Sequence, residues 1–349
     1  MSISFDGQLF RIHGCLVLKP MMISRLESIC EDRVPVEMEQ NLLTNFRPVL
    51  RSGEWSDIGG RSYVEDTHIC ISDLAKKFGC NLLMEEPISF YGVFDGHGGE
   101  RAAQFVRDHL PRVIVEDADF PLELEKVVTR SLIKTDAALA ETCSLMSALS
   151  SGTTALTPVI FGRSLLVANA GDFRTVLSKR GRAIEMSKDH KPCCGKERAR
   201  IESPGGHVED GYLNGQLSVT RALGDWHIEG MKVKGEKGGL LSAEPELKLI
   251  TLTKEDEFLI IGSDGIWDVF SNQNSVSFAR RRLQEHNDVK LCCKEMVEAK
   301  KRGATDNLTV VVISFHLELP PLAVTVRKFP TPILDSWQGR HKLSLALWS

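Results

Sequence analysis

The sequence lacks any run of about 20 apolar residues, the length that a membrane-spanning helix requires. Its first short apolar run, residues 15–18, ends at Lys19 and Pro20 and is too short for the core of a secretory signal. Residue 2 is a serine, which does not support myristoylation. We therefore expect no membrane association and a location in the cytoplasm, the nucleus or both.

The sequence also lacks an excess of one charge. Its 43 Lys and Arg against 47 Asp and Glu give a formal net charge of −4. Proteins that bind nucleic acid through phosphate contacts are strongly basic, so we expect no nucleic-acid partner. The hydrophobic fraction of 42 % excludes disorder throughout and is sufficient for a sizeable core.

Cysteines with the spacing of a zinc site are absent as well. The nine cysteines are odd in number, and the two closest pairs, Cys193–Cys194 and Cys292–Cys293, are adjacent residues. Zinc sites favour spacers that let both sulfur atoms face one ion. Reduced thiols in a nuclear or cytosolic protein are the favoured interpretation.

Short apolar segments rich in β-branched residues predict strands at 88–94, 164–169, 174–177, 247–252, 257–262 and 308–314. Helical spacing of apolar residues predicts helices at 98–110, 122–142, 276–285 and 288–302. Pro111 should stop or kink the first helix. Strands and helices are grouped and do not alternate regularly, which favours an α+β fold with helices packed outside antiparallel sheets.

The strongest chemical signal is YGVFDGHGG at residues 91–99, where an apolar strand ends in Asp95 before a glycine loop and a helix. Alone, this pattern fits a turn whose aspartate caps the helix equally well. The arrangement recurs, however, with acids beside other apolar segments: Glu65, Asp66, Asp172, Asp264 and Asp306. His97, next to these acids in the loop, is placed for proton transfer.

Recurring carboxylates at strand ends are the ligands that Mg²⁺ and Mn²⁺ take, and the presence of few His and no clustered Cys disfavours zinc. Each acid alone has a simpler explanation as a turn residue, and Asp225 could be a buried partner of Arg221. Taken together, the acids favour a metal site over a set of independent turns.

Residues 51–316 resemble the PP2C (PPM) family of metal-dependent serine/threonine protein phosphatases, in their plant-like form. The motifs occur in family order: RSYVEDTH, FYGVFDGHGG, SGTTA, LLVANAGDFR, SKDHKP, GQLSVTRALGD, FLIIGSDGIWDV and TDNLTVVVI. The resemblance implies a four-layer sandwich of two antiparallel β-sheets flanked by helical pairs. It also implies one catalytic domain, 51–316, between an N-terminal extension, 1–45, and a C-terminal tail, 319–349.

The resemblance implies hydrolysis of phosphoserine and phosphothreonine in protein substrates by a monomeric enzyme. A metal-bound water at a two-metal Mg²⁺ or Mn²⁺ centre would attack phosphorus with no phosphoenzyme intermediate. By position in the motifs, Asp95 bridges both ions, and Glu65 and the carbonyl of Gly96 complete the protein ligands of one ion. The matching positions give the remaining roles: Asp264 and Asp306 hold the other ion, Asp172 with Asp264 forms a weaker third site, Asp66 orients metal-bound water, Arg61 binds phosphate, and His97 is the general acid.

Three features depart from the family pattern. Pro158 falls inside an expected strand, 155–161, and a strand proline belongs at an edge or a bulge. Phe173 stands where a small residue is usual and could alter the loop near the third metal site. The segment 206–215 lacks the tryptophan of the abscisic-acid co-receptor subgroup, so we expect no receptor lock of that type.

Two other functions stay open from the sequence. A non-enzymatic module with the same fold is motivated by Pro158 and Phe173, although no candidate ligand is replaced. A nucleotide-binding enzyme could use Gly96–Gly99 as a phosphate cradle before a helix. The absence of a GxxxxGK[ST] loop counts against this second alternative.

Overall fold

The computed structural model describes residues 46–80, 86–145, 150–233 and 239–316. The predicted N-terminal extension and C-terminal tail therefore lie outside the described residues. At the centre are two five-stranded sheets with the strand orders β1-β15-β14-β8-β9 and β13-β7-β6-β3-β2. Every strand pairing within them is antiparallel.

The first sheet is built from β1 (Arg51–Asp57), β15 (Leu308–Ser314), β14 (Asp256–Gly262), β8 (Arg174–Lys179) and β9 (Arg182–Glu185). The second sheet is built from β13 (Glu246–Thr251), β7 (Ser164–Ala170), β6 (Ala155–Phe161), β3 (Ile88–Phe94) and β2 (Thr67–Ile71). The predicted strands 88–94 and 308–314 are found with the same bounds.

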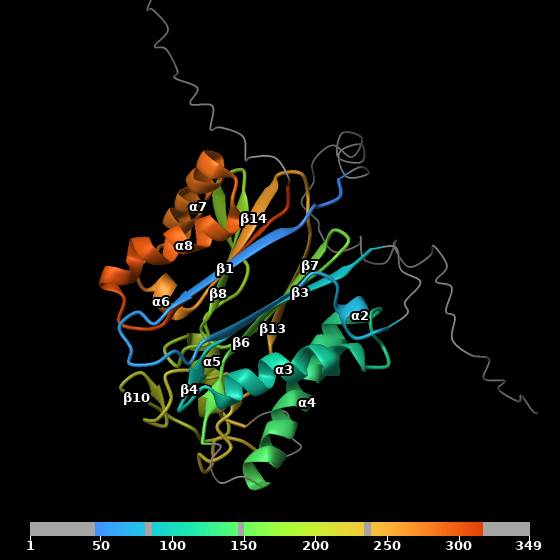
Figure 1. Cartoon of the computed structure of the whole chain (residues 1–349). Helices are drawn as coiled ribbons and strands as arrows, with labels where there is room; N and C mark the ends of the chain where they lie inside the picture. The colour runs from blue at the N-terminus through green and yellow to red at the C-terminus, as the bar shows by residue number, and fades with distance from the viewer. Residues whose placement is uncertain (1–45, 81–85, 146–149, 234–238, 317–349) are drawn as a thin grey trace, which may run out of the picture.

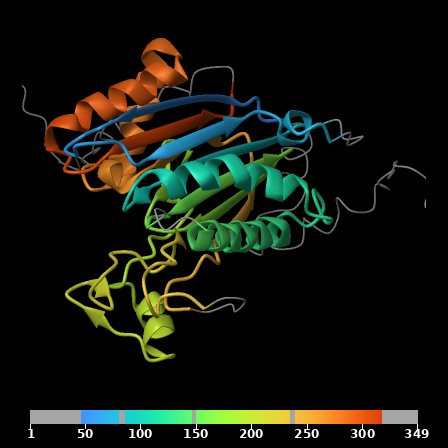
Figure 2. The same ribbon diagram turned by 60° about the horizontal axis from the view of Figure 1, so that its bottom comes forward.

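Helices cover both outer faces of the pair of sheets (Figures 1 and 2). α7 (Asn272–His286) and α8 (Val289–Lys300) pack on the first sheet, and α3 (Arg101–Val115) and α4 (Leu124–Leu145) pack on the second. A further short helix, α2 (Leu74–Lys77), contacts β3. The predicted α+β sandwich of two antiparallel sheets with a helical pair on each side is confirmed.

Strand β14 shows why the central strands are apolar throughout. Phe258 and Ile260 face α7 and α8, whereas Leu259 and Ile261 lie in the cluster between the two sheets. Successive side chains of a strand point to opposite faces, so a strand covered on both sides needs apolar residues at every position. Four packed layers follow from this pattern.

Two prolines are accommodated differently from the prediction. α3 does not end at Pro111 but continues to Val115, and Pro111 is buried in its packed face. Pro158 lies in β6, a central strand and not an edge strand. Its pairing with β7 continues through Val167, whereas the pairing with β3 is interrupted between Phe90 and Val93. Proline has no N–H to donate, and the gap in the pairing of β6 with β3 accommodates this missing donor.

A smaller unit extends beyond the layers (Figure 2). It contains α5 (Gly195–Glu202) and the hairpin of β10 (Val208–Glu209) and β11 (Tyr212–Leu213), around its own apolar cluster. A separate three-stranded sheet is formed by β12 (Leu223–Gly224), β5 (Gly152–Thr153) and β4 (Gly96–His97), in that order. In the part of the chain that the structure describes, no helix is both long and apolar enough to cross a membrane.

Candidate metal centre

The predicted acids meet at one edge of the two sheets because antiparallel pairing places the end of one strand beside the start of the next. Asp66 precedes β2, and Asp95 follows β3, whose last residue pairs with the first of β2. In the other sheet Asp264 follows β14, and Asp306 precedes β15. Asp172 follows β7 and lies close enough to Asp95 to repel it electrostatically.

The loop after β3 folds against the segment that carries Glu65. The backbone N–H of Gly96 donates to the Glu65 carbonyl at 3.3 Å, and the N–H of Gly99 donates to Glu65 Oε1 at 2.5 Å. A Cβ atom on Gly96 would lie 2.8 Å from the Glu65 carbonyl oxygen, so only glycine permits this approach. Because Glu65 already occupies the N–H of Gly99, the loop is less suited to cradling a nucleotide phosphate.

Asn307 holds the two sides of the site together, a role that the sequence reasoning missed. Its Nδ2 donates to the carbonyls of Ile58 at 2.9 Å and Tyr63 at 3.1 Å, and its Oδ1 accepts from the Glu65 N–H at 2.9 Å. Its own carbonyl accepts from the hydroxyl of Ser263 at 3.2 Å. The one available signal was its place beside Asp306, at the start of an apolar strand.

Burial raises the pKa of four of these acids, Asp172 among them, and mutual repulsion adds to the rise in the other three. Burial, with repulsion from Asp306, raises the pKa of Asp66 to about 7. The pKa of Asp264 rises to about 7 through burial and the charges of Asp172 and Asp306. Burial and the surrounding carboxylates, Asp66 first, raise the pKa of Asp95 well above its ordinary value. The positively charged side chains among the described residues do not offset the negative charge of the cluster.

The residues present fit divalent cations. Asp66 Oδ2 and Asp172 Oδ1 are buried without a hydrogen-bond partner, and a buried carboxylate oxygen without a partner is costly. All the candidate ligands are oxygens, the donors that Mg²⁺ and Mn²⁺ prefer. Within the described ranges, however, no three His, Cys, Asp or Glu side chains stand in metal-binding geometry as they are. Glu65 and Asp306 are bonded to protein donors instead.

Arg61 is the donor on Asp306. Its Nη2 lies 2.5 Å from Asp306 Oδ2, and the side chain of Arg61 is 52 % exposed. This hydrogen bond raises the pKa of Arg61, and the charges of Asp95 and Glu65 add to the rise. The predicted phosphate ligand and a predicted metal ligand therefore neutralise each other at the rim of the site.

His97 lies at the same edge and is bonded to Asp225, with 2.7 Å between Nε2 and Oδ2. Burial alone would lower the pKa of His97, but the hydrogen bond and charge of Asp225 raise it. Gly152 lies beside this pair, and a Cβ there would collide with Asp225 Oδ2 and His97 Nε2. The suggested pairing of Asp225 with Arg221 is wrong, because Arg221 Nη2 lies 2.6 Å from Glu197 instead.

The sequence matches the family model described as protein phosphatase 2C over residues 56–308. The chain belongs to the protein phosphatase 2C family. It is 67 % identical over 323 residues to the probable protein phosphatase 2C 27 of Oryza sativa subsp. japonica, covering 92 % of this chain and 91 % of the relative. The probable protein phosphatase 2C 22 of Arabidopsis thaliana is 57 % identical over 330 residues, covering 93 % and 84 %. The chain is thus a protein serine/threonine phosphatase, as the motifs predicted.

Solved structures agree with the fold. The serine-threonine phosphatase 2C from Toxoplasma gondii superposes with a TM-score of 0.66 at 22 % identity, covering 77 % of this chain and 97 % of that one. The structure titled as a C. elegans sex determining protein gives a TM-score of 0.65 at 26 % identity, covering 78 % and 65 %.

Phe173, the residue that departs from the family pattern beside Asp172, is part of the core. Its side chain is fully buried in the cluster between the two sheets. It therefore anchors the residue before it, Asp172, from the core side. On the open side, Lys191 Nζ lies 3.5 Å from Asp172 Oδ2.

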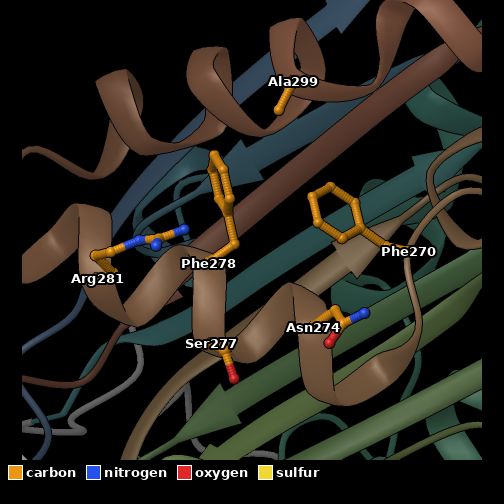
Figure 3. A pocket seen from close by; sticks show the side chains of 6 residues that line it. All are labelled: Phe270, Asn274, Ser277, Phe278, Arg281 and Ala299. Atoms are coloured by element: carbon orange, nitrogen blue, oxygen red, sulfur yellow. The ribbon is translucent and has the colours of Figure 1, made fainter.

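The open hollow in Figure 3 is separate from the phosphatase's acidic edge. It measures about 430 Å³ and lies between α7 and α8, with Phe270 and Phe278 on its apolar side and Arg281 at its rim. None of the predicted site residues lines it.

Proposed function

We propose that the phosphatase hydrolyses phosphoserine and phosphothreonine in proteins with two Mg²⁺ or Mn²⁺ ions and no phosphoenzyme intermediate. The observation that carries this proposal is the convergence of six carboxylates with two orphaned oxygens, on Asp66 and Asp172. Added positive charge stabilises such a cluster, and divalent cations supply it.

The candidate ligands divide between the two sheets. Asp95 would be shared between the ions, with Glu65 and the Gly96 carbonyl on one side. Asp264 and Asp306 would serve the other side, with Asp172 available for a weaker third ion. When bound, the ions would activate a water for attack on phosphorus and offset charge on the phosphoryl oxygens.

The remaining groups act on substrate and protons. Arg61 would release Asp306 and donate its two-pronged guanidinium to the phosphoryl oxygens, which its exposure allows. Asp66, buried beside Asp95, would accept a hydrogen bond from a nearby water. His97, whose pKa is raised by the hydrogen bond and charge of Asp225, would donate a proton to the departing serine or threonine oxygen.

The test is hydrolysis of a phosphothreonine peptide by the full chain after chelation, then after addition of Mn²⁺ or Mg²⁺. We expect no turnover with chelator, recovery with either ion, and no recovery in Asp95→Asn. Calorimetric titration with Mn²⁺ should show two binding events in the wild type and weakened binding in the variant. Metal-independent turnover, or full activity of Asp95→Asn, would overturn the proposal. Monomeric state and cytoplasmic or nuclear location stay predictions of the sequence.

A further inference from the structure

A turn beyond the acidic edge brings Asp225 to His97. In the small sheet, His97 pairs with Gly152, which in turn pairs with Gly224. The backbone then adopts left-handed conformations at Gly224 (φ +85°) and Asp225 (φ +56°). Aspartate adopts such a conformation more readily than most residues other than glycine, but at a cost in energy that contacts around it must offset. Something must therefore fix this turn.

The carboxylate of Asp136, in the middle of α4, supplies that constraint. Asp136 is 6 % exposed and accepts from the N–H of Gly224 at 2.7 Å and from Nε1 of Trp226 at 3.1 Å. Gly224 and Trp226 are the two chain neighbours of Asp225. The carboxylate thus holds the turn on both sides of Asp225 without touching Asp225 itself.

Lys232 completes the arrangement. Its side chain is 4 % exposed, and Nζ donates to both oxygens of Asp136 at 2.7 and 2.8 Å. It also donates to the carbonyl of Ala222 at 2.8 Å and lies 5.2 Å from the ring centroid of Trp226. A buried carboxylate needs such a compensating cation. Asp136 and Lys232 together therefore contact residues 222, 224 and 226, every second residue of the segment that contains Asp225.

We propose that Asp136 and Lys232 are positioning residues that set the orientation of the His97 ring through Asp225, an inference that rests on the proposed function of His97 as proton donor. Asp225 engages Nε2 of His97, which leaves Nδ1 as the ring nitrogen that can donate a proton to the departing oxygen. When the P–O bond breaks, its electron pair stays on the serine or threonine oxygen, which takes this proton and leaves as the hydroxyl. A misplaced ring would impair only that transfer.

The test compares two substrates of the full-length enzyme with Mn²⁺. In Asp136→Asn we expect kcat for a phosphothreonine peptide to fall about tenfold to a hundredfold, the range that a 1 Å misplacement can cause. KM should stay unchanged within about twofold, because no substrate contact is lost. For p-nitrophenyl phosphate, whose leaving group departs without a proton, kcat should change by less than about threefold.

Matched variants separate positioning from stability. Asp117, which precedes α4, is also a buried acid (7 % exposed) and is bonded to Arg130 and Lys134 of that helix. Asp117→Asn should leave kcat for both substrates unchanged. Trp226→Phe removes a single N–H donor and should reproduce the selective loss in weaker form. If Asp136→Asn fails to fold, the result for Trp226→Phe decides whether the contact with Asp136 positions His97.

His97→Gln provides the reference pattern. If the wild type is active and His97→Gln loses peptide hydrolysis selectively, an equal loss on both substrates in Asp136→Asn overturns the inference. Equal kcat values for Trp226→Phe and wild type on the peptide overturn it too. If His97→Gln itself loses both substrates equally, the proposed role of His97 fails and the positioning role fails with it.

Discussion

The buried acids of this phosphatase form two regions with opposite electrostatics. In the smaller unit, burial would raise the pKa of Glu197, but Arg221, Arg200 and Thr220 lower it to about 2. At the acidic edge, burial and repulsion raise the pKa of Asp66 and Asp264 to about 7. Burial is common to both regions, so the partners make the difference.

The comparison shows which acids serve the structure and which need something more. The charge of Glu197 is compensated by a guanidinium nitrogen of Arg221 at 2.6 Å and one of Arg200 at 3.1 Å. Among the residues that the structure describes, the cations bonded to the acidic edge lie at its rim, Arg61 on Asp306 and Lys191 on Asp172. Under the proposed function, divalent cations from solution would compensate its remaining negative charge.

Asp264→Asn should give the largest effect at the acidic edge. We expect peptide phosphatase activity to fall at least about a hundredfold, since altering even the outer partners of a metal ligand costs about 10–100-fold. In chelator, the variant should unfold at the same temperature as the wild type or higher, because one repelling charge is gone. Activity assays and calorimetry of the chelated protein check both parts. A clear loss of metal-free stability would place Asp264 with the structural acids.

Glu197→Gln should behave in the opposite way. Removing one charge of a buried pair leaves Arg221 uncompensated and should lower the free energy of unfolding by about 3–5 kcal/mol. Urea unfolding measures this loss. The affinity for Mn²⁺ of the folded fraction should stay that of the wild type. A strong loss of metal affinity with normal stability would contradict the division into two regions.

Asn307→Leu should weaken the contact between the two sides of the site. The carbonyls of Ile58 and Tyr63 and the N–H of Glu65 lose their partner, so we expect Mn²⁺ affinity about 10–100-fold lower. Isothermal titration with Mn²⁺ measures it. Asn274→Leu, at an exposed position of α7, is the control and should bind Mn²⁺ normally. Equal affinities for the two variants would remove the positioning role of Asn307.

A pH dependence of stability is also expected without metal. The native pKa values of Asp66 and Asp264, about 7, exceed the ordinary value of about 3.9 of the unfolded chain. Between these values the native state binds more protons, so stability should fall as pH rises from about 4 to 7. Glu197, with its pKa lowered to about 2, contributes the opposite slope below about pH 4.

Thermal unfolding in chelator from pH 3 to 8 checks both slopes. Mn²⁺ at about 100 times its dissociation constant should add roughly 2.7 kcal/mol and remove the fall toward pH 7. The double variant Asp66→Asn with Asp264→Asn should make the fall shallower without metal, leaving the part that Asp95 contributes. A fall as steep as that of the wild type would show that other groups cause it.

Much of the fold could be predicted from local patterns. β3 and β15 were predicted with their bounds because both are continuous apolar segments buried on two faces. β1 and β2 were not predicted from the residues, since Arg51–Asp57 is mostly polar and half-buried. Pro111 misled the prediction of α3 because packing of its buried face outweighs the loss of one helical hydrogen bond.

The sequence by itself determined the fold class, the family and the identities of the acids that converge, because strand ends and motifs are short-range features. Only the tertiary structure decided the partners: Asn307 with the loop of Glu65, Arg61 with Asp306, and Asp225 with His97. These contacts join residues more than 100 positions apart. Their formation depends on how two sheets and a small third one meet, which no local propensity specifies.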